Sequence, residues 1–281
     1  MNTLKVWYVT GASQGLGLTL VKKLLDEGYR VAATSRNVET LKQAVGLDDK
    51  SRFLALAVDL NDIDILQQSI EKTISNFGAI DVVVNNAGYG MAGTLEEIPV
   101  QKIVDIIDVN ILSTINVTKQ ILPYFRAQKS GYFINISSVA GFVGSPGWSV
   151  YSATKAAVIA FSEVLALDVE ELGIKVTVVE PAGFRTGFLS KGSLAFEETN
   201  IPEYKAVKDT QVRYLAMDGK QPGDPNKVAK IFISLAESID PPVHLFLGAD
   251  AYNRASQKID TLKEEMVKWQ PVTVCADFSK T

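Results

Sequence analysis

Short apolar runs alternate with longer amphipathic segments along most of the chain. The short runs are rich in β-branched residues and apolar on both faces, which is typical of strands inside a covered parallel sheet. The longer segments repeat their apolar positions with the period of a helix. This pattern predicts strands over residues 4–10, 30–35, 52–58, 80–85, 131–137, 174–180 and 243–247, and helices near 15–28, 62–77, 98–126, 149–172 and 225–237.

The alternation predicts an α/β fold: one doubly wound parallel sheet of about seven strands with helices on both faces. No repeat or linker-like composition interrupts residues 1–248, so we expect one domain there. Residues 182–224 form a long insertion that we interpret as a lid or substrate wall. Residues 249–281 form a tail with a helical stretch from Ala255 to Trp269. This tail could either cap an oligomer surface or cover the site.

The composition narrows the possible partners. The chain has 281 residues, 47% of them hydrophobic, and a net charge of −4. This charge argues against a broad surface for nucleic acid or anionic lipid, so any phosphate must be bound locally. No apolar run approaches the roughly 20 residues that span a bilayer, and the N-terminus lacks the pattern of a signal peptide. We therefore expect a cytoplasmic protein without a membrane partner.

Two residue types occur once. Cys275 is the only cysteine, which excludes an intrachain disulfide and fits a reducing compartment. His244 is the only histidine and lies in an apolar run, where we expect a structural role. A single cysteine and a single histidine exclude a thiolate–imidazole metal site, and we expect no metal.

A glycine-rich turn follows the first predicted strand and precedes a helix. It reads Thr10-Gly11-Ala12-Ser13-Gln14-Gly15-Leu16-Gly17. Glycines permit a tight turn, and the free N–H groups of the following helix then face a pyrophosphate. The position of the turn, after the first strand, favours a dinucleotide site over a plain strand-to-helix connection.

The end of the second strand distinguishes the two nicotinamide dinucleotides. An acidic residue there would bind the ribose hydroxyls of NAD, whereas cations would bind the 2′-phosphate of NADP. The chain has Ser35-Arg36 at this place, and a guanidinium forks well onto phosphate. We expect NADP(H) rather than NAD, with a solvated surface arginine as the alternative.

A tyrosine and a lysine stand at the start of the helix over 149–172. Tyr151 and Lys155 are four positions apart and therefore share one helical face. A nearby ammonium and the positive end of the helix would lower the tyrosine pKa from its usual value near 10 toward the range useful for acid–base catalysis. Strand 131–137 ends at Ser137 and Ser138, at the edge of the sheet where ligands bind.

These elements, in this order, resemble those of the short-chain dehydrogenase/reductase family. They match its TGxxxGxG loop, its NNAG element and its Ser…Tyr-x-x-x-Lys array, and the resemblance covers about residues 4–248. The resemblance implies a Rossmann-type fold. It also implies that Ser138 and Tyr151 bind the substrate carbonyl while hydride arrives from C4 of the nicotinamide and Tyr151 delivers the proton. Lys155 would hold the cofactor ribose, and Asn110 would organise a water relay toward Lys155. The implied catalytic residues are Asn110, Ser138, Tyr151 and Lys155.

The same resemblance assigns the cofactor contacts. Asp59 occupies the position that meets the adenine ring, and the segment from Pro181 to Thr186 resembles the family's PGxxxT element, with Ala182 in place of glycine. The expected cofactor-binding residues are Thr10, Gly11, Ser13, Gln14, Gly15, Leu16, Gly17, Ser35, Arg36, Asp59, Leu60, Asn86, Ala87, Gly88, Tyr151, Lys155, Pro181 and Thr186.

The substrate is less well defined than the reaction. The segment from Gly223 to Ala251 is similar to a subgroup related to 17β-hydroxysteroid dehydrogenases, which does not assign a steroid. Apolar residues in the loops could form the wall of a site for a lipophilic substrate, or simply belong to the nearby core. These candidates are Tyr89, Met91, Phe142, Val143, Trp148, Phe184, Phe188 and Leu189.

The sequence thus predicts an NADP(H)-dependent oxidoreductase that interconverts a small-molecule carbonyl and alcohol. A non-catalytic dinucleotide sensor or scaffold on the same fold is the alternative. A serine hydrolase would lack the Gly-x-Ser-x-Gly turn and would have to use His244 as its base. The long helix over 149–172 could pack against its symmetry mate, so we expect a homo-oligomer, a dimer or tetramer.

Overall fold

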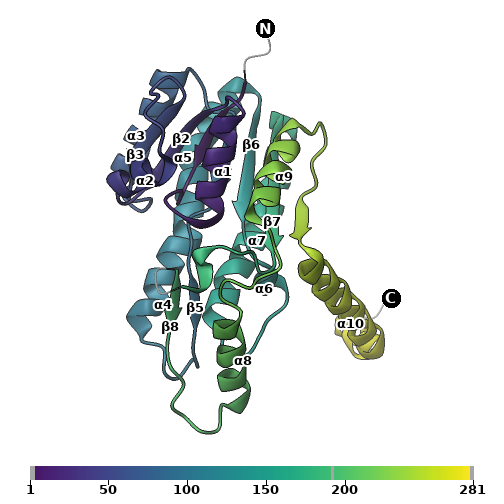
Figure 1. The fold of residues 1–281 in the computed structure, drawn as a ribbon. Coiled ribbons are helices and arrows are strands. Elements are labelled where there is room, and N and C mark those ends of the chain that lie inside the picture. Colours follow the sequence, from purple (N-terminus) through teal and green to yellow (C-terminus); the bar gives the residue numbers. More distant parts are fainter. Residues whose placement is uncertain (1–3, 191–192, 279–281) are drawn as a thin grey trace.

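A seven-stranded parallel sheet forms the centre of the protein, and the computed structural model describes residues 4–190 and 193–278 of the chain (Figure 1). The order of strands across the sheet is β3-β2-β1-β4-β6-β7-β9. Their bounds are β1 Val6–Val9, β2 Arg30–Ser35, β3 Phe53–Ala57, β4 Val82–Asn85, β6 Gly131–Ile136, β7 Ile174–Pro181 and β9 His244–Leu247.

Helices cover both faces of this sheet. On one face lie α1 (Gly15–Asp26), α2 (Val38–Val45) and α9 (Pro225–Glu237), and on the other lie α3 (Ile63–Phe77), α5 (Ser113–Gln128) and α7 (Ser149–Val169). Alternate strand residues face the two layers: Trp7 and Val9 join the first core, while Val6 and Tyr8 join the second. The strands are therefore apolar on both faces, as the sequence pattern predicted.

The chain reverses its winding direction between β1 and β4. From β1 it runs outward to β2 and β3, and it then returns to β4 on the other side of β1. In doubly wound sheets, ligands bind at the carboxyl ends of the strands beside such a switch point. The fold thus places a binding site at the ends of β1 and β4.

The predicted strands and the doubly wound fold are confirmed, but several helices differ from the prediction. The helix expected over 98–126 consists of α4 (Val100–Ile107), a π-helical turn (Asp108–Leu112) and α5. Helix α2 was not predicted because only Leu41 among its eight residues is buried, which leaves little apolar periodicity. Helix α10 (Ala249–Thr273) is longer than the expected stretch from Ala255 to Trp269.

The insertion over 182–224 contains regular elements. Strand β8 (Leu194–Phe196) pairs in parallel with β5 (Gly90–Ala92), and helix α8 (Lys205–Ala216) follows. Strands of three residues are too short to show a period of two. Helices α8 and α10 both extend beyond the carboxyl edge of the sheet (Figure 1).

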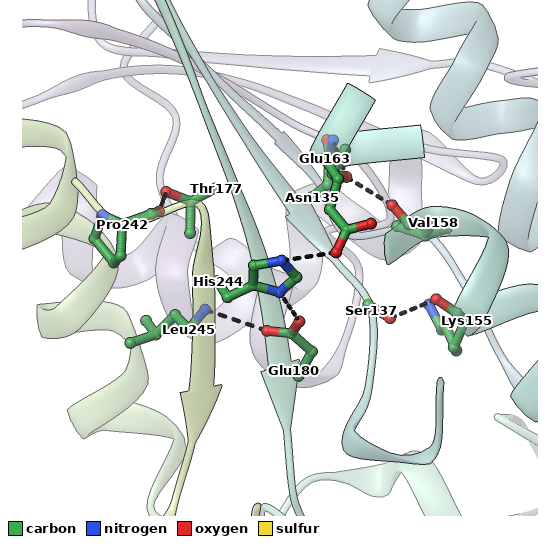
Figure 2. Close-up of polar contacts among 11 residues, drawn as sticks. Asn135, Ser137, Lys155, Val158, Glu163, Thr177, Glu180, Pro242, His244 and Leu245 are labelled. Atoms are coloured by element: carbon green, nitrogen blue, oxygen red, sulfur yellow. Dashed lines mark hydrogen bonds and ion pairs between the residues drawn. The ribbon is translucent and has the colours of Figure 1, made fainter. Parts of the chain in front are cut away.

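Polar contacts attach α7 to the sheet within an otherwise apolar interface. Ser137 Oγ donates to the Lys155 carbonyl at 2.7 Å (Figure 2). Asn135 Nδ2 donates to Ser162 Oγ at 2.9 Å. By length and composition alone, the helical stretch from Ser149 to Leu172 could cross a membrane. Its inward residues, including Val158 and Leu165, pack instead in the core of this fold.

His244 lies between two carboxylates at the edge of the sheet. Its Nε2 is 2.9 Å from Glu163 Oε1 on α7, and its Nδ1 is 2.9 Å from Glu180 Oε1 on β7 (Figure 2). The Glu180 side chain is 0% exposed, and its other oxygen accepts from the Leu245 N–H at 3.2 Å. Burial raises the pKa of Glu180, and its contacts with His244 oppose that shift. His244 therefore has the structural role that the sequence predicted.

We expect His244→Ala to lower the free energy of unfolding by about 2 kcal/mol, because it leaves the buried Glu180 carboxylate without its side-chain partner. Urea unfolding measures this loss. Glu163→Gln is the matched control on the exposed side of the ring and should cost less than about 1 kcal/mol. Equal losses in the two variants would contradict this account of Glu180.

Candidate active site

A large cavity opens at the carboxyl ends of the central strands, as the switch point predicts. Its volume is about 1810 Å³, and it extends from the glycine-rich turn after β1, past the end of β6, to helices α8 and α10. Most of the residues predicted for the cofactor and for catalysis line this one cavity. They are Gly11, Ser13, Gln14, Gly15, Leu16, Ser35, Arg36, Asp59, Leu60, Asn86, Ala87, Gly88, Ser138, Tyr151, Lys155, Pro181 and Thr186.

The glycine-rich turn is held tightly against the segment after β4. Gly11 has a φ of +62°, and a Cβ there would lie 2.8 Å from Ala87 Cα, so only glycine fits. Asn86 Nδ2 donates to the carbonyls of Thr10 and Gly11 at 2.9 and 3.0 Å. These contacts fix the path of the turn into α1.

The N-terminus of α1 faces this cavity without a side-chain cap. Gln14 occupies the N-cap position, and its side chain donates to Ser193 Oγ at 2.7 Å instead of capping the helix. The first N–H groups of a helix have no partner within it, so they favour an anion. The turn therefore has the donors that a pyrophosphate needs.

Arg36 lies at the end of β2, where the cavity reaches the surface. It lines the cavity beside Ser35, and among the described residues it forms no ion pair. Helix α2 begins just beyond it, and Thr40 from the first turn of this helix also lines the cavity. The Asn37 side chain caps this helix by accepting from the Thr40 N–H, so the group at this end of the cavity that suits a phosphate is the Arg36 guanidinium.

Tyr151 and Lys155 lie on the first turns of α7 and face the end of β6. The Tyr151 side chain is buried, and its ring packs edge-on against Trp148 with the centroids 5.5 Å apart. Lys155 Nζ donates to the Ile136 carbonyl at 2.9 Å and lies 6.0 Å from the centre of the Tyr151 ring.

Ser138 caps the short helix α6 (Val139–Phe142). Its Oγ accepts a hydrogen bond from the Ala140 N–H at 3.1 Å. This bond uses the oxygen only as an acceptor, so the Ser138 hydroxyl keeps a proton that it can donate toward the cavity. Ser138 and Tyr151 line the same part of the cavity.

The pKa of Tyr151 differs from the sequence-based expectation. Burial raises it to about 12, and a hydrogen bond with Ser138 only partly opposes this shift. Burial also lowers the pKa of Lys155 to about 8. The expected lowering of the tyrosine pKa by Lys155 is wrong for this structure, because loss of solvent around the phenol dominates and the ammonium is directed to the Ile136 carbonyl. At neutral pH the phenol holds its proton and can act as a donor.

Asn110 lies in the π-helical turn, buried behind the cavity. Its Oδ1 accepts from the Tyr89 N–H at 3.0 Å, and its Nδ2 donates to the Tyr89 carbonyl at 3.0 Å and to Thr154 Oγ1 at 3.1 Å. A Cβ on Gly88 would lie 3.1 Å from Asn110 Oδ1 and 3.3 Å from Lys155 Nζ, so both groups approach that glycine. The structure thus brings Asn110 near Lys155, and the water relay stays a prediction.

The segment after β7 is tied to the end of the insertion. The Arg185 guanidinium donates from two nitrogens to the Gln221 carbonyl, each at 3.2 Å. The Arg185 N–H donates to the Gly223 carbonyl at 2.9 Å, and the Gly223 N–H donates to the Gly183 carbonyl at 3.1 Å. These bonds define the local path, which the sequence left open because Ala182 departs from the family pattern.

Several predicted residues lie outside the cavity lining. Thr10 is buried beneath the turn, where its Oγ1 accepts from the Asn86 and Ala87 N–H groups at 3.0 and 3.1 Å. Gly17 is packed against Asn86, and a Cβ there would lie 2.5 Å from Asn86 Nδ2. Of the apolar wall candidates, Met91 is part of a core and Phe142 packs on Phe246.

Sequence reasoning missed the residues that helices α8 and α10 add to the cavity. The helical stretch in the tail was visible in the sequence, but nothing there indicated which surface it covers. These lining residues are Arg213 and Tyr214 of α8, Met217 at its C-cap, and Asp250, Arg254, Gln257, Lys258, Thr261, Leu262 and Glu265 of α10.

The chain is similar to known proteins in both sequence and fold. The family model described as short chain dehydrogenase matches residues 5–194. The chain is 35% identical over 273 residues to "Oxidoreductase BOA17" of Botryotinia fuckeliana, which covers 97% of this chain and 99% of that protein. A short-chain dehydrogenase from Streptomyces avermitilis has a similar solved structure, with a TM-score of 0.88, 35% identity, and coverage of 97% of this chain and 100% of that one.

Two further solved structures of this fold carry different cofactors. ElxO has NADP bound, with 27% identity, a TM-score of 0.70 and coverage of 86% of this chain and 96% of that one. A 3-ketoacyl-(acyl-carrier-protein) reductase from Brucella melitensis is complexed with NADH, with 21% identity, a TM-score of 0.69 and coverage of 86% and 95%. The family match, the relative that spans nearly the whole chain and the shared fold lead to one conclusion: the chain belongs to the short-chain dehydrogenase/reductase family of oxidoreductases that bind NAD(P).

Proposed function

We propose that the protein is an NADP(H)-dependent oxidoreductase that interconverts a carbonyl and an alcohol, with Tyr151 as the general acid and base. The observation that carries this proposal is the convergence of Tyr151, Ser138 and Lys155 on one cavity that begins at a dinucleotide-type turn. The glycine-rich turn and the uncapped N-terminus of α1 suit a pyrophosphate. The N-terminal turns of α7 hold Tyr151 and Lys155, the groups that would act on the substrate.

In the direction of reduction, Ser138 and Tyr151 donate hydrogen bonds to the substrate carbonyl oxygen. NADPH, held at the glycine-rich turn and beside Arg36, would supply a hydride to the carbonyl carbon. Negative charge then develops on the oxygen, where two donors fixed in a buried site stabilise it. The Tyr151 O–H bond breaks as its proton passes to this oxygen, giving the alcohol and a phenolate that is reprotonated from solvent. A phenol with a pKa raised to about 12 carries the proton this step needs.

Arg36 supports NADP(H) over NAD(H). It is a cavity-lining cation without an ion-pair partner in the described parts of the chain, and it stands where an NAD site needs an acid.

The exposed Cys275 is compatible with a reducing compartment such as the cytoplasm.

The substrate end of the cavity supports a lipophilic substrate. Trp148 packs against both Tyr151 and Tyr214, at centroid distances of 5.5 and 4.8 Å. Phe188 and Leu189 from the insertion line the same region. A carbonyl compound with an apolar body fits beside these side chains better than a small polar one.

We also propose a homo-oligomer. The outward face of α7 leaves Leu167 74% exposed and Val164 56% exposed. Large apolar side chains exposed together on one helix are typical of an interface, and a two-fold axis would bring this face against its copy.

Tyr151→Phe should lower kcat for carbonyl reduction by roughly 10²–10⁴-fold, because it removes the proton donor and leaves the ring packing intact. The dissociation constant of NADPH, measured by fluorescence titration of the same variant, should change less than about threefold. Turnover that survives the loss of the hydroxyl would overturn the catalytic role. Cofactor binding without turnover of any carbonyl or alcohol by the unmodified protein would favour a dinucleotide sensor.

Arg36→Asp should weaken NADPH binding roughly 10- to 100-fold and leave NADH binding unchanged or stronger, because it replaces a cation at the 2′-phosphate by an anion. Titration of each cofactor measures the two constants. Arg126→Asp makes the same charge change on the exposed end of α5 and should leave both constants unaltered. A preference for NADH in the unmodified protein would show that the assignment of Arg36 is wrong.

Leu167→Glu should reduce the mass of the protein in solution to that of a smaller assembly, because it places a charge in the proposed apolar interface. Light scattering after size exclusion measures the mass. Ile65→Glu on α3 is a control for adding the same charge at another exposed apolar position. A monomeric unmodified protein, or an unchanged mass in Leu167→Glu, would contradict this interface.

A further inference from the structure

Helix α10 contacts the segment that carries Ser138. Its first turns pack on the body through small buried residues, Ala251 and Ala255. On the same side of the helix, Arg254 Nη2 donates to the Val143 carbonyl at 2.9 Å and Lys258 Nζ donates to the Phe142 carbonyl at 2.6 Å. Two cations of α10 therefore bind two successive carbonyls of the chain next to the site.

These two carbonyls lie at the C-terminal end of α6, and Ser138 lies at its N-terminal end. The helix consists of a single turn from Val139 to Phe142, with Val143 as its C-cap. A cation beside the last carbonyls of a helix satisfies acceptors that have no partner within it and interacts favourably with its negative end. Ser138 caps the opposite end through its bond from the Ala140 N–H.

A single helical turn is unstable by itself, since nucleation is unfavourable and few bonds repay it. Within α6, the Gly141 N–H donates to the Ser138 carbonyl and the Val143 N–H donates to the Val139 carbonyl. The remaining support comes from outside. A Cβ on Gly141 would lie 2.6 Å from the Lys155 carbonyl carbon, so α6 packs directly on the backbone of α7, and α10 holds the far end.

Lys258 also contacts the side chain at this end of α6. Its Nζ lies 5.4 Å from the centre of the Phe142 ring, which packs in turn on Phe246 of β9 with centroids 5.2 Å apart. The position of α6 is thus set by α7 on one side and by α10 and β9 on the other. Neither Arg254 nor Lys258 belongs to the two apolar cores that cover the sheet.

We propose that Arg254 and Lys258 are positioning residues for Ser138: by binding the last carbonyls of α6, they fix the turn that aims the Ser138 hydroxyl at the substrate carbonyl. This rests on the proposed function, in which Ser138 stabilises the developing charge. Stabilisation of that kind depends on donors held in place before the reaction, and small displacements reduce it strongly. The C-terminal helix is then part of the catalytic apparatus.

The first test is a double-mutant cycle between Lys258 and Ser138. Lys258→Met keeps the apolar stem over Phe142 and removes the donor, and we expect kcat to fall about tenfold with the NADPH dissociation constant unchanged. In a Ser138→Ala background, the same change should alter kcat less than about twofold, because the group it positions is already gone. Lys258→Arg, which keeps a cationic donor, should retain most of the kcat of the unmodified protein. Losses that multiply in the double variant would overturn the proposal, since Lys258 would then act independently of Ser138.

The second test does not depend on turnover. Hydrogen exchange of the Gly141 and Val143 amides, whose bonds define α6, should be faster in Lys258→Met than in the unmodified protein. Lys263→Met, on an exposed face of the same helix, is the matched control and should leave exchange and kcat unchanged. Unchanged exchange in Lys258→Met would overturn the proposal that Lys258 fixes α6. An unmodified protein that turns over no carbonyl would instead overturn the proposed function, and the exchange result would still decide whether Lys258 fixes α6.

Discussion

The site depends on the reciprocal attachment of α7 to the end of β6. Lys155 Nζ donates to the carbonyl of Ile136, the last residue of β6, while Ser137 Oγ donates back to the Lys155 carbonyl, so the two bonds hold the two residues directly before Ser138. The two bonds fix both the rotation and the axial position of α7 on the sheet. Because Tyr151 lies one turn before Lys155, they also fix the direction of the phenol.

This attachment has an electrostatic consequence. An ammonium and a phenol are buried together, and burial disfavours the charged form of each, so the pKa of Lys155 falls to about 8 and that of Tyr151 rises to about 12. A buried lysine of this kind destabilises the fold at neutral pH, which is a common feature of functional sites. In the proposed reaction, the protonated phenol is the form that donates a proton to a carbonyl oxygen.

Much of the fold and of the site could be predicted because each depends on local patterns. The parallel sheet follows from strands that are apolar on both faces, and the site follows from a glycine-rich turn and from Tyr151 and Lys155 at helical spacing. The pairing of β5 with β8 and the position of α10 depend on contacts between distant segments, which no periodicity records. The direction of the Tyr151 pKa shift was mispredicted for the same reason, because the spacing reveals a neighbouring charge but not the depth of burial.

In the proposed reaction, this cavity brings a nicotinamide and a carbonyl together beside Tyr151. The most direct measurement follows deuterium from NADPH that carries it at both C4 positions of the nicotinamide, using mass spectrometry of the product of a lipophilic ketone. We expect an alcohol that carries the deuterium on its carbinol carbon, with one label transferred for each NADPH oxidised. An alcohol formed without the label, or NADPH oxidised with no label in any product, would contradict it.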